Sequence, residues 1–265
     1  MDQKIIGLLP AAGQGSRISP LPMSKELFPI GFQDLAGKGL RPKVACQYLL
    51  EAMGLGGVQE SFLILRPGKW DIPAYLGDGS QLGMRLAYLT VHVPFGVPFS
   101  LNQAYPFVKD AIIAMGFPDI LFSPADAYTQ LINRLQTTQA DVVLGLFPTD
   151  QPGKVGLVDF DSAGVVSGIY EKSNLTHLRY MWAIALWRPS FTDFLHQFVE
   201  TKLRALIGEE SPMLLKQIPN YTETPIGDVI MGAIANNLRV EAIPFKDGHY
   251  LDIGTPENLI KAVYH

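Results

Sequence analysis

The sequence predicts an α/β fold: a mostly parallel sheet flanked by helices, with a mixed, partly antiparallel second half. In the first half, short apolar runs alternate with stretches of helical periodicity, which is the pattern of βαβ units. The first apolar run passes directly into a glycine-rich loop. From about residue 153, short apolar runs follow one another, and a turn signal at 161–164 predicts a hairpin.

The first half is expected to contain five strands and three helices. The predicted strands are residues 4–9, 60–65, 84–91, 112–115 and 141–147. Ile-Ile and Leu-Leu pairs in the first of them indicate burial on both faces. The predicted helices are residues 44–53, 104–111 and 128–138. Residues 31–42 are rich in glycine and are interpreted as a loop.

The second half is expected to contain four more strands and three helices. The strands are residues 155–160, 165–170, 181–187 and 240–245. The helices are residues 191–206, 226–237 and 256–264. Because the sequence shows no repeat, low-complexity segment or linker, residues 1–265 are predicted to form a single domain.

Composition narrows the class of protein. Charged residues make up 17% of the 265 residues and hydrophobic residues 48%, which argues against a disordered chain. A net charge of -4 gives no support for a nucleic-acid-binding surface, and no apolar run is long enough for a membrane span. The single cysteine, Cys46, excludes an intramolecular disulfide and suits a reducing compartment. We therefore expect a cytoplasmic protein without a signal peptide.

The loop after the first predicted strand has the features of an anion site. Gly13 and Gly15 let backbone N–H groups approach an anion closely, and Arg17 and Lys25 supply positive charge. This combination suits a triphosphate. No Lys-Ser or Lys-Thr follows the glycines, as a P-loop requires, and Ile18 replaces the third small residue of a dinucleotide fingerprint. No G-x-S-x-G element supports hydrolase chemistry.

Several motifs together resemble those of the sugar-1-phosphate nucleotidyltransferases. Residues 8–29 resemble the signature L-A-A-G-x-G-T-R…P-K-x-L-x-P, with Ser16 for Thr and Ser24 for the Pro before Lys25. Residues 76–84 are similar to L-G-D-G-S-x-W-G, and residues 250–256 to W-x-D-x-G-T. Glu171-Lys172 resembles the E-K-P element, so the likeness to glucose-1-phosphate thymidylyltransferases and uridylyltransferases covers nearly the whole chain.

The resemblance implies a Rossmann-like fold of the nucleotide-diphospho-sugar transferase type and a reaction that joins a nucleoside triphosphate, dTTP or UTP, to a sugar 1-phosphate. Arg17 would hold the β and γ phosphates, and Lys25 would stabilise the α-phosphate. The loop residues implied in cradling the nucleotide are Ala11, Ala12, Gly13, Gly15 and Ser16. Family members are often oligomers, so a homo-oligomer is open.

The resemblance also implies Mg²⁺, which prefers one or two carboxylates together with substrate phosphates. Asp119, preceded by Pro118 where the family has Gly, and Asp252 in the Asp-x-Gly-Thr element match the family's carboxylates. Asp126 is a rival to Asp119. The alternative is that Asp119 caps a turn and Asp252 caps the last helix.

The base-recognition element departs from the family. Gln103-Ala104 resembles the Gln-Ala of G-x-A-Q-A, and a Gln side chain suits the imide edge of uracil or thymine. The leading Gly of that element is absent, so a polar residue at a helix start is the alternative. Gly83 would fit a backbone that packs near the base.

The residues expected at the sugar site differ most from the family pattern. Glu171 would accept hydrogen bonds from sugar hydroxyls, Lys172 would bind the sugar phosphate, and Gly156 would let the sugar approach the backbone. Trp182 and Ile184 replace small residues of the family's Y-A-V-T-G segment, and both are expected to add volume at the hexose site. A smaller acceptor, loss of catalysis or stacking of Trp182 on a sugar would each explain this. The rival function is a non-catalytic member that binds a nucleotide or nucleotide sugar.

Overall fold

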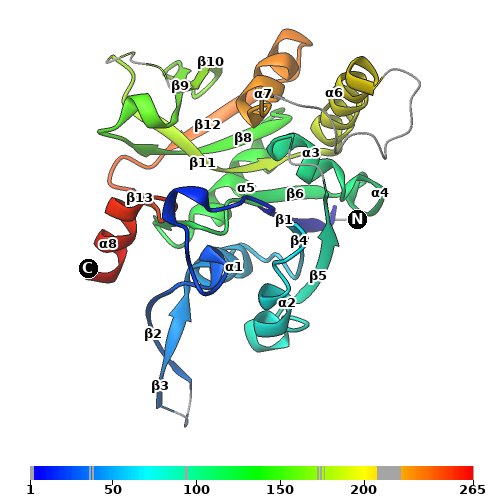
Figure 1. Cartoon of the computed structure of the whole chain (residues 1–265). Helices are drawn as coiled ribbons and strands as arrows, with labels where there is room; N and C mark the ends of the chain where they lie inside the picture. The colour runs from blue at the N-terminus through cyan, green and yellow to red at the C-terminus, as the bar shows by residue number, and fades with distance from the viewer. Residues whose placement is uncertain are drawn as a thin grey trace.

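The computed structural model describes residues 3–35, 37, 39–92, 95–171, 173, 175, 177–207 and 222–264. A nine-stranded sheet forms its centre (Figure 1). The path along this sheet runs β10-β9-β11-β6-β1-β4-β5, and β8 and β12 branch from β11. The predicted α/β class with a largely parallel first half is confirmed.

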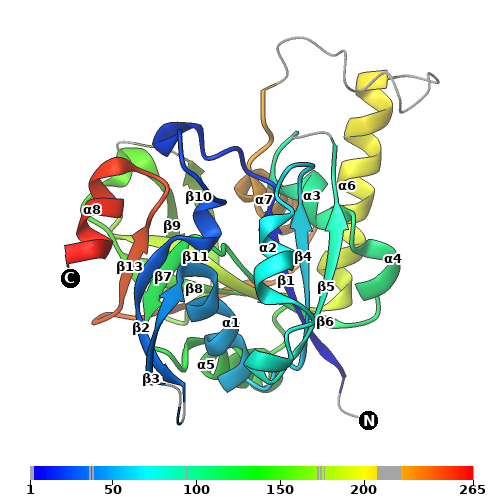
Figure 2. The same ribbon diagram turned by 60° about the horizontal axis from the view of Figure 1, so that its bottom comes forward.

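The parallel part of the sheet is built around β1 (Ile5–Ala11). It lies between β6 (Ile112–Gly116) and β4 (Glu60–Leu65), and β4 pairs in turn with β5 (Arg85–Thr90). Figure 2 shows β4 and β5 running side by side in the same direction. All five residues of β6 are buried, as expected of a parallel strand covered on both faces.

The second half adds antiparallel pairs, as predicted. The long strand β11 (Tyr180–Trp187) is antiparallel to β6, to β8 (Val142–Pro148) and to β9 (Gly156–Phe160). Strands β9 and β10 (Val166–Glu171) form the expected hairpin. β12 (Val240–Pro244) returns parallel to β8.

Helices cover both faces of the sheet (Figure 1). One face carries α3 (Val97–Asn102), α4 (Tyr105–Val108), α6 (Pro189–Ile207) and α7 (Ile226–Ala235). The other face carries α1 (Ala45–Leu55), α2 (Asp71–Leu76) and α5 (Ala127–Thr137). Within the ranges that the structure describes, none of the helices combines the length and apolarity needed to cross a bilayer.

The prediction of a loop at 31–42 is wrong. This stretch forms a two-stranded hairpin of β2 (Pro29–Leu35) and β3 (Gly39–Val44), which projects from the body of the molecule (Figure 1). The hairpin is largely exposed, and Phe32 is 71% exposed. A strand that buries neither face lacks the apolar alternation by which strands are predicted.

The helix predicted at 104–111 is confirmed only over α4, and the preceding α3 was not predicted. Each of these two short helices has a proline in its first turn, Pro98 and Pro106. Proline suits the first turn because its missing N–H is not needed there. The chain enters α3 through Gly96, whose φ of 110° is in the left-handed region.

A small second sheet escaped prediction. Strands β7 (Ile120–Ser123) and β13 (His249–Asp252) pair antiparallel at the edge of the molecule. The last helix, α8 (Pro256–Tyr264), packs here through Ala262 against Ile253 and Ala45. This packing attaches the last helix to the start of α1.

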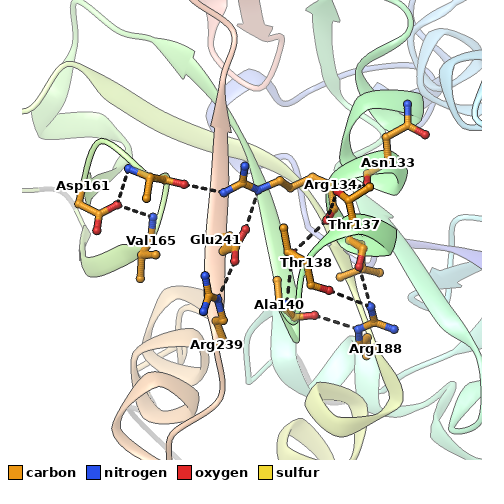
Figure 3. A network of polar contacts seen from close by, with 12 residues as sticks. Asn133, Arg134, Thr137, Thr138, Ala140, Asp161, Val165, Arg188, Arg239 and Glu241 are labelled. Atoms are coloured by element: carbon orange, nitrogen blue, oxygen red, sulfur yellow. Dashed lines mark hydrogen bonds and ion pairs between the residues drawn. The ribbon is translucent and has the colours of Figure 1, made fainter.

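A polar network ties α5 to the second half of the sheet (Figure 3). Glu241, on β12, is fully buried and accepts 2.6 Å hydrogen bonds from Nε of Arg134 and Nε of Arg239. Arg134 also donates to the carbonyl of Ala163, in the hairpin between β9 and β10. Because a buried carboxylate is costly unless it is paired, these arginines are essential to the position of Glu241.

Candidate active site

A pocket of about 400 Å³ lies at the carboxyl ends of β1 and β6. Ligands of open α/β sheets bind at this edge of the parallel strands. The residues that line the pocket are Pro10, Ala12, Gly13, Arg17, Lys25, Glu26, Gly96, Val97, Ser100, Phe117, Asp119, Ile120, Glu223 and Asp252. The pocket is therefore lined by the glycine-rich loop, the residues around Lys25, the start of α3 and both carboxylates that were predicted to bind the metal.

The glycine-rich loop leaves its backbone open to the pocket. Gly15 has a φ of 64°, a conformation that glycine adopts readily, and it starts a single 3₁₀ turn, Ser16–Ile18. A Cβ built on Gly13 would meet nothing within 4 Å. Ala12 also lines the pocket, whereas Ala11 is the buried end of β1 and Ser16 is exposed outside the lining.

Asp119 and Asp252 lie together because of the small second sheet. Asp252 is opposite Ile120 in the ladder, and the amide of Ile253 donates to the carbonyl of Asp119 at 3.1 Å. A Cβ built on Gly254 would lie 2.8 Å from Asp252 Oδ1 and 3.6 Å from Asp119 Oδ2. Burial raises the pKa of Asp252, and the neighbouring charge of Asp119 raises it further.

The two cations, Lys25 and Arg17, each lie close to one of these two carboxylates. The Lys25 ammonium is bound to the Asp119 carboxylate, and both side chains are largely buried. Arg17 Nη2 lies 3.6 Å from Asp252 Oδ2 and remains 64% exposed. Burial lowers the pKa of Lys25, but the charge of Asp119 outweighs this and the pKa is raised. Lys25 therefore carries a positive charge at neutral pH.

Glu26 is a buried acid beside these groups, and it was not predicted as a site residue. It is only 2% exposed, and its Oε1 accepts a 2.6 Å hydrogen bond from Lys69 Nζ. Its Oε2 has no hydrogen-bond partner among the described residues. Burial raises the pKa of Glu26, although the charge of Lys69 opposes this.

The paired carboxylates suit Mg²⁺ by their chemistry. Two like charges held side by side are unfavourable, and a divalent cation would relieve the repulsion that raises the pKa of Asp252. Among the residues that the structure describes, no group of three or more His, Cys, Asp or Glu forms a complete protein cage for a metal. Mg²⁺ needs no such cage, because it takes one or two carboxylates with substrate phosphates.

Three of the predicted sugar residues form a second cluster. A Cβ built on Gly156 would lie 2.9 Å from Glu171 Oε1 and 3.1 Å from Trp182 Nε1. The Trp182 ring lies 5.8 Å from the ring of Phe117, which lines the pocket. The cluster thus borders the pocket through Phe117, while Lys172 lies outside the described residues.

Only one of the two bulky replacements faces this cluster. Strand β11 has an irregularity between Trp182 and Ile184, so the two side chains enter opposite faces of the sheet. Trp182 packs in the core under α3, α6 and α7, whereas Ile184 packs against Gly145 on the other face. The expectation that Ile184 adds volume at the hexose site is therefore wrong.

Three other predicted residues are not brought to the pocket. Gln103 is exposed at the carboxyl end of α3, a turn away from the lining residue Ser100. Gly83 precedes β5, at the amino ends of the parallel strands. Asp126 is the residue before α5, and its side chain contacts Gln130.

Residues at the start of α3 line the pocket where Gln103 was expected. Gly96, Val97 and Ser100 line the pocket. A Cβ on Gly96 would collide with the backbone of Thr224, so only glycine allows this close approach. The Gly-x-Pro sequence at 96–98 is a helix-start signal that could have located this element from sequence.

Comparison with known proteins supports one family. The family model described as nucleotidyl transferase matches residues 6–265. A low-salt glycan biosynthesis nucleotidyltransferase of Haloferax volcanii is 23% identical over 97% of this chain and 64% of its own length. A glucose-1-phosphate thymidylyltransferase of an Actinoplanes species is 30% identical over 63% of this chain and 52% of its own length. The chain thus spans about half to two thirds of these relatives.

A solved structure shows the same fold. The crystal structure of a UDP-glucose pyrophosphorylase complexed with UDP-glucose superposes with a TM-score of 0.73. The alignment covers 98% of this chain and 97% of that chain at 18% identity.

Proposed function

This chain belongs to the nucleotidyl transferase family, and we propose that it joins a nucleoside triphosphate to a sugar 1-phosphate and releases pyrophosphate. The observation that carries the proposal is the meeting of Arg17, Lys25, Asp119 and Asp252 at one pocket. They come from separate parts of the chain, and such a mixture of cations and carboxylates suits a polyphosphate with its metal ion.

The reaction is a single in-line displacement. An oxygen of the sugar phosphate attacks the α-phosphorus of the triphosphate, and the bond from the α-phosphorus to the bridging oxygen breaks. Pyrophosphate leaves with the electron pair of that bond. No protein nucleophile is needed, so the protein acts by positioning and by neutralising charge.

The triphosphate is held by the loop and the two cations. Gly13 and Ala12 line the pocket and offer backbone N–H groups to the phosphates, while Gly15 lines the adjoining pocket that shares Lys25. Arg17 is exposed at the pocket, so it can hold the β and γ phosphates and release them to solvent as pyrophosphate. Lys25 is buried and charged, so it stabilises the negative charge that grows at the α-phosphate.

Asp119 and Asp252 would hold Mg²⁺ together with phosphate oxygens of the substrate. The ion supplies Lewis-acid neutralisation of the phosphate charge when it is bound. Asp119 also contacts the Lys25 ammonium, and Asp252 lies near Arg17. Each cation is thus kept close to the position at which it meets the substrate.

The acceptor occupies the cluster next to this pocket. Glu171 accepts hydrogen bonds from sugar hydroxyls, Gly156 leaves room for the ring, and Trp182 borders the sugar with its indole N–H. Lys172 is proposed for the sugar phosphate from the family's E-K-P element. Because Trp182 replaces a small residue, the acceptor site is narrower than the family pattern implies.

The proposed triphosphate is dTTP or UTP. The base lies against the start of α3, where Gly96 and Val97 offer backbone groups and Ser100 a hydroxyl. These groups can meet the imide edge of uracil or thymine. Gln103, one turn further along, reaches the base only if α3 moves.

The proposal is tested by measuring pyrophosphate release from a panel of triphosphates and sugar 1-phosphates with Mg²⁺ and folded protein. Turnover is expected with dTTP or UTP and at least one sugar 1-phosphate. Calorimetric titration of the same nucleotides provides the second measurement. Binding without turnover in every combination would support the non-catalytic alternative and contradict the proposal.

A further inference from the structure

The residue before Lys25 is held by the two hydrogen bonds that it donates to one carboxylate. Ser24 donates its amide to Asp71 Oδ2 at 2.6 Å and its hydroxyl to Asp71 Oδ1 at 2.7 Å. Asp71 is the first residue of α2, and its Oδ1 also accepts the amide of Ile72 at 3.1 Å. The carboxylate is thus fixed by its own helix and presents both oxygens to Ser24.

The residue after Lys25 is held from the same part of the chain. Glu26 accepts the 2.6 Å hydrogen bond from Lys69, which lies two positions before Asp71 in the β4–α2 segment, residues 66–76. Glu26 is 2% exposed and Lys69 is 8% exposed. The β4–α2 segment therefore binds Ser24 and Glu26, the two residues on either side of Lys25. The lysine side chain itself reaches Asp119.

Open space borders the stretch that leads to Lys25. A pocket of about 520 Å³ is lined by Ser24 and Lys25, and an apolar pocket of about 940 Å³ is lined by Pro22 and Met23. Asp71 lines both pockets, so its contacts with Ser24 lie at their edge.

The two donors of Ser24 are absent where the family has proline at this position. The family signature to which residues 8–29 are similar has proline before the lysine. Proline has neither an amide N–H nor a hydroxyl, so it could make neither contact with Asp71. The φ of Ser24 is -60°, which proline adopts without strain. A substitution by proline therefore removes the contacts and keeps the backbone geometry.

We infer that Asp71, acting through Ser24, is a positioning residue that fixes Lys25 for nucleotidyl transfer, and that Lys69 supports it through Glu26. The inference rests on the proposed role of Lys25. Lys25 is proposed to stabilise charge that grows in the transition state, so its position affects the rate of transfer. A misplacement of about 1 Å in a catalytic group can cost about 100-fold in rate. The loss is therefore expected in kcat, with the KM for the sugar phosphate unchanged.

The test compares wild type with Asp71→Ala, Ser24→Pro and the double variant. Each single variant is expected to lower kcat about 10- to 100-fold. The double variant is expected to be no slower than the slower single variant, because both substitutions remove the same contact. Ser24→Thr keeps both donors and is expected to retain kcat. Unchanged kcat in both single variants, with an active wild type, would overturn the inference and leave the proposed function standing.

Hydrogen–deuterium exchange of residues 22–28 gives a readout that does not depend on turnover. The amide of Leu27 donates to the carbonyl of Ser24 at 2.9 Å, so its protection reports on the turn that carries Lys25. Faster exchange confined to this stretch is expected in Asp71→Ala and Ser24→Pro. Unchanged exchange would overturn the inference. If the wild type turns over no substrate pair, the proposed function fails and the exchange result alone decides the positioning role.

Asp78→Ala is the matched control. Asp78 lies just after α2, and its carboxylate accepts the amide of Ser80 at 2.9 Å. Neither kcat nor exchange at 22–28 is expected to change. An equal effect in this variant would show general loosening of the α2 region and would overturn the specific role of Asp71.

Discussion

Asp119 and Asp252 are adjacent because β7 and β13 pair, with the amide of Ile253 bound to the carbonyl of Asp119 at 3.1 Å. The pairing brings together two carboxylates that are about half the chain apart in sequence. Each carboxylate also meets a cation, Lys25 or Arg17. The small sheet is therefore the element that assembles the candidate active site.

Asp252→Asn is predicted to remove turnover without weakening the fold. Asparagine keeps an oxygen for the 2.7 Å hydrogen bond from the Gly254 amide but loses the charge proposed for Mg²⁺. Activity should fall at least about 100-fold, the scale of a lost electrostatic contact at the reacting group. The melting temperature should be as high as that of wild type, because the substitution removes the repulsion between residue 252 and Asp119.

The control for this prediction is Asp126→Asn, the rival carboxylate from the sequence. Its side chain contacts Gln130 at the start of α5, away from the pocket lining. Turnover should remain at the wild-type level. A large loss in Asp126→Asn together with a small loss in Asp252→Asn would reverse the assignment of the metal carboxylate.

Trp182→Val is predicted to shift acceptor preference toward larger sugars. The indole stands beside Gly156 and Glu171, so its removal enlarges the cluster proposed for the acceptor. The measurement is the ratio of kcat/KM for a hexose 1-phosphate to that for a pentose 1-phosphate, which does not depend on the folded fraction. The ratio should rise, although a buried Trp truncation also costs about 3 kcal/mol of stability.

Ile184→Val serves as the control for Trp182, since Ile184 packs on the opposite face of the sheet. Its acceptor ratio should equal that of wild type. If the two variants changed the ratio equally, the effect would come from β11 as a whole, and the acceptor role of Trp182 would be refuted.

Arg134→Met is predicted to lower the free energy of unfolding by about 3 kcal/mol. This is the lower end of the range for removing one partner of a buried ion pair. Glu241 is fully buried and would keep only Arg239, whose side chain is 51% exposed (Figure 3). Urea unfolding measures the change. The matched control is Arg85→Met, which breaks an exposed pair with Glu60 and should cost less than about 1 kcal/mol. Equal losses would contradict this account of Glu241.

Asp71 is predicted to contribute stability that depends on pH. Burial raises its pKa, but the hydrogen bonds from Ser24 outweigh burial and the pKa is lowered. Ionised Asp71 therefore stabilises the fold above its unfolded pKa of about 3.9, and this contribution is lost as the pH falls through the lower folded pKa. Asp71→Asn should be less stable than wild type near neutral pH, with a difference that shrinks below about pH 4.

Denaturant unfolding of wild type and Asp71→Asn across this range measures the difference directly. The prediction concerns the gap between the two proteins, since other acids titrate equally in both. A gap that stayed constant from neutral pH to below about pH 4 would show that Asp71 acts without its charge.

The parallel core was predictable because its strands are continuous apolar runs. The runs 4–9, 60–65 and 112–115 correspond to β1, β4 and β6, which are buried in the middle of the sheet. The hairpin β2–β3 and the pair β7–β13 were missed, because exposed or four-residue strands have no distinctive apolar period. The pairing of β7 with β13 also joins segments that are far apart in the sequence.

The candidate site was predictable where the residues form a local motif. Gly13, Arg17 and Lys25 were found by their spacing after a strand, and they do line the pocket, while their roles stay predictions. Glu26 and Asp71 were missed because their importance comes from contacts across the fold. Gln103 was chosen by a local match, but the proline-started helix places it one turn beyond the pocket.

The central claim is transfer of a nucleotidyl group at the pocket of Lys25 and Asp252. The most direct measurement follows label from α-³²P-labelled dTTP or UTP in the presence of a sugar 1-phosphate and Mg²⁺. Wild type should move the label into a nucleotide sugar with an equal amount of pyrophosphate, while Lys25→Ala and Asp252→Asn should not. No label transfer with any sugar phosphate, or transfer that survives both substitutions, would contradict the account.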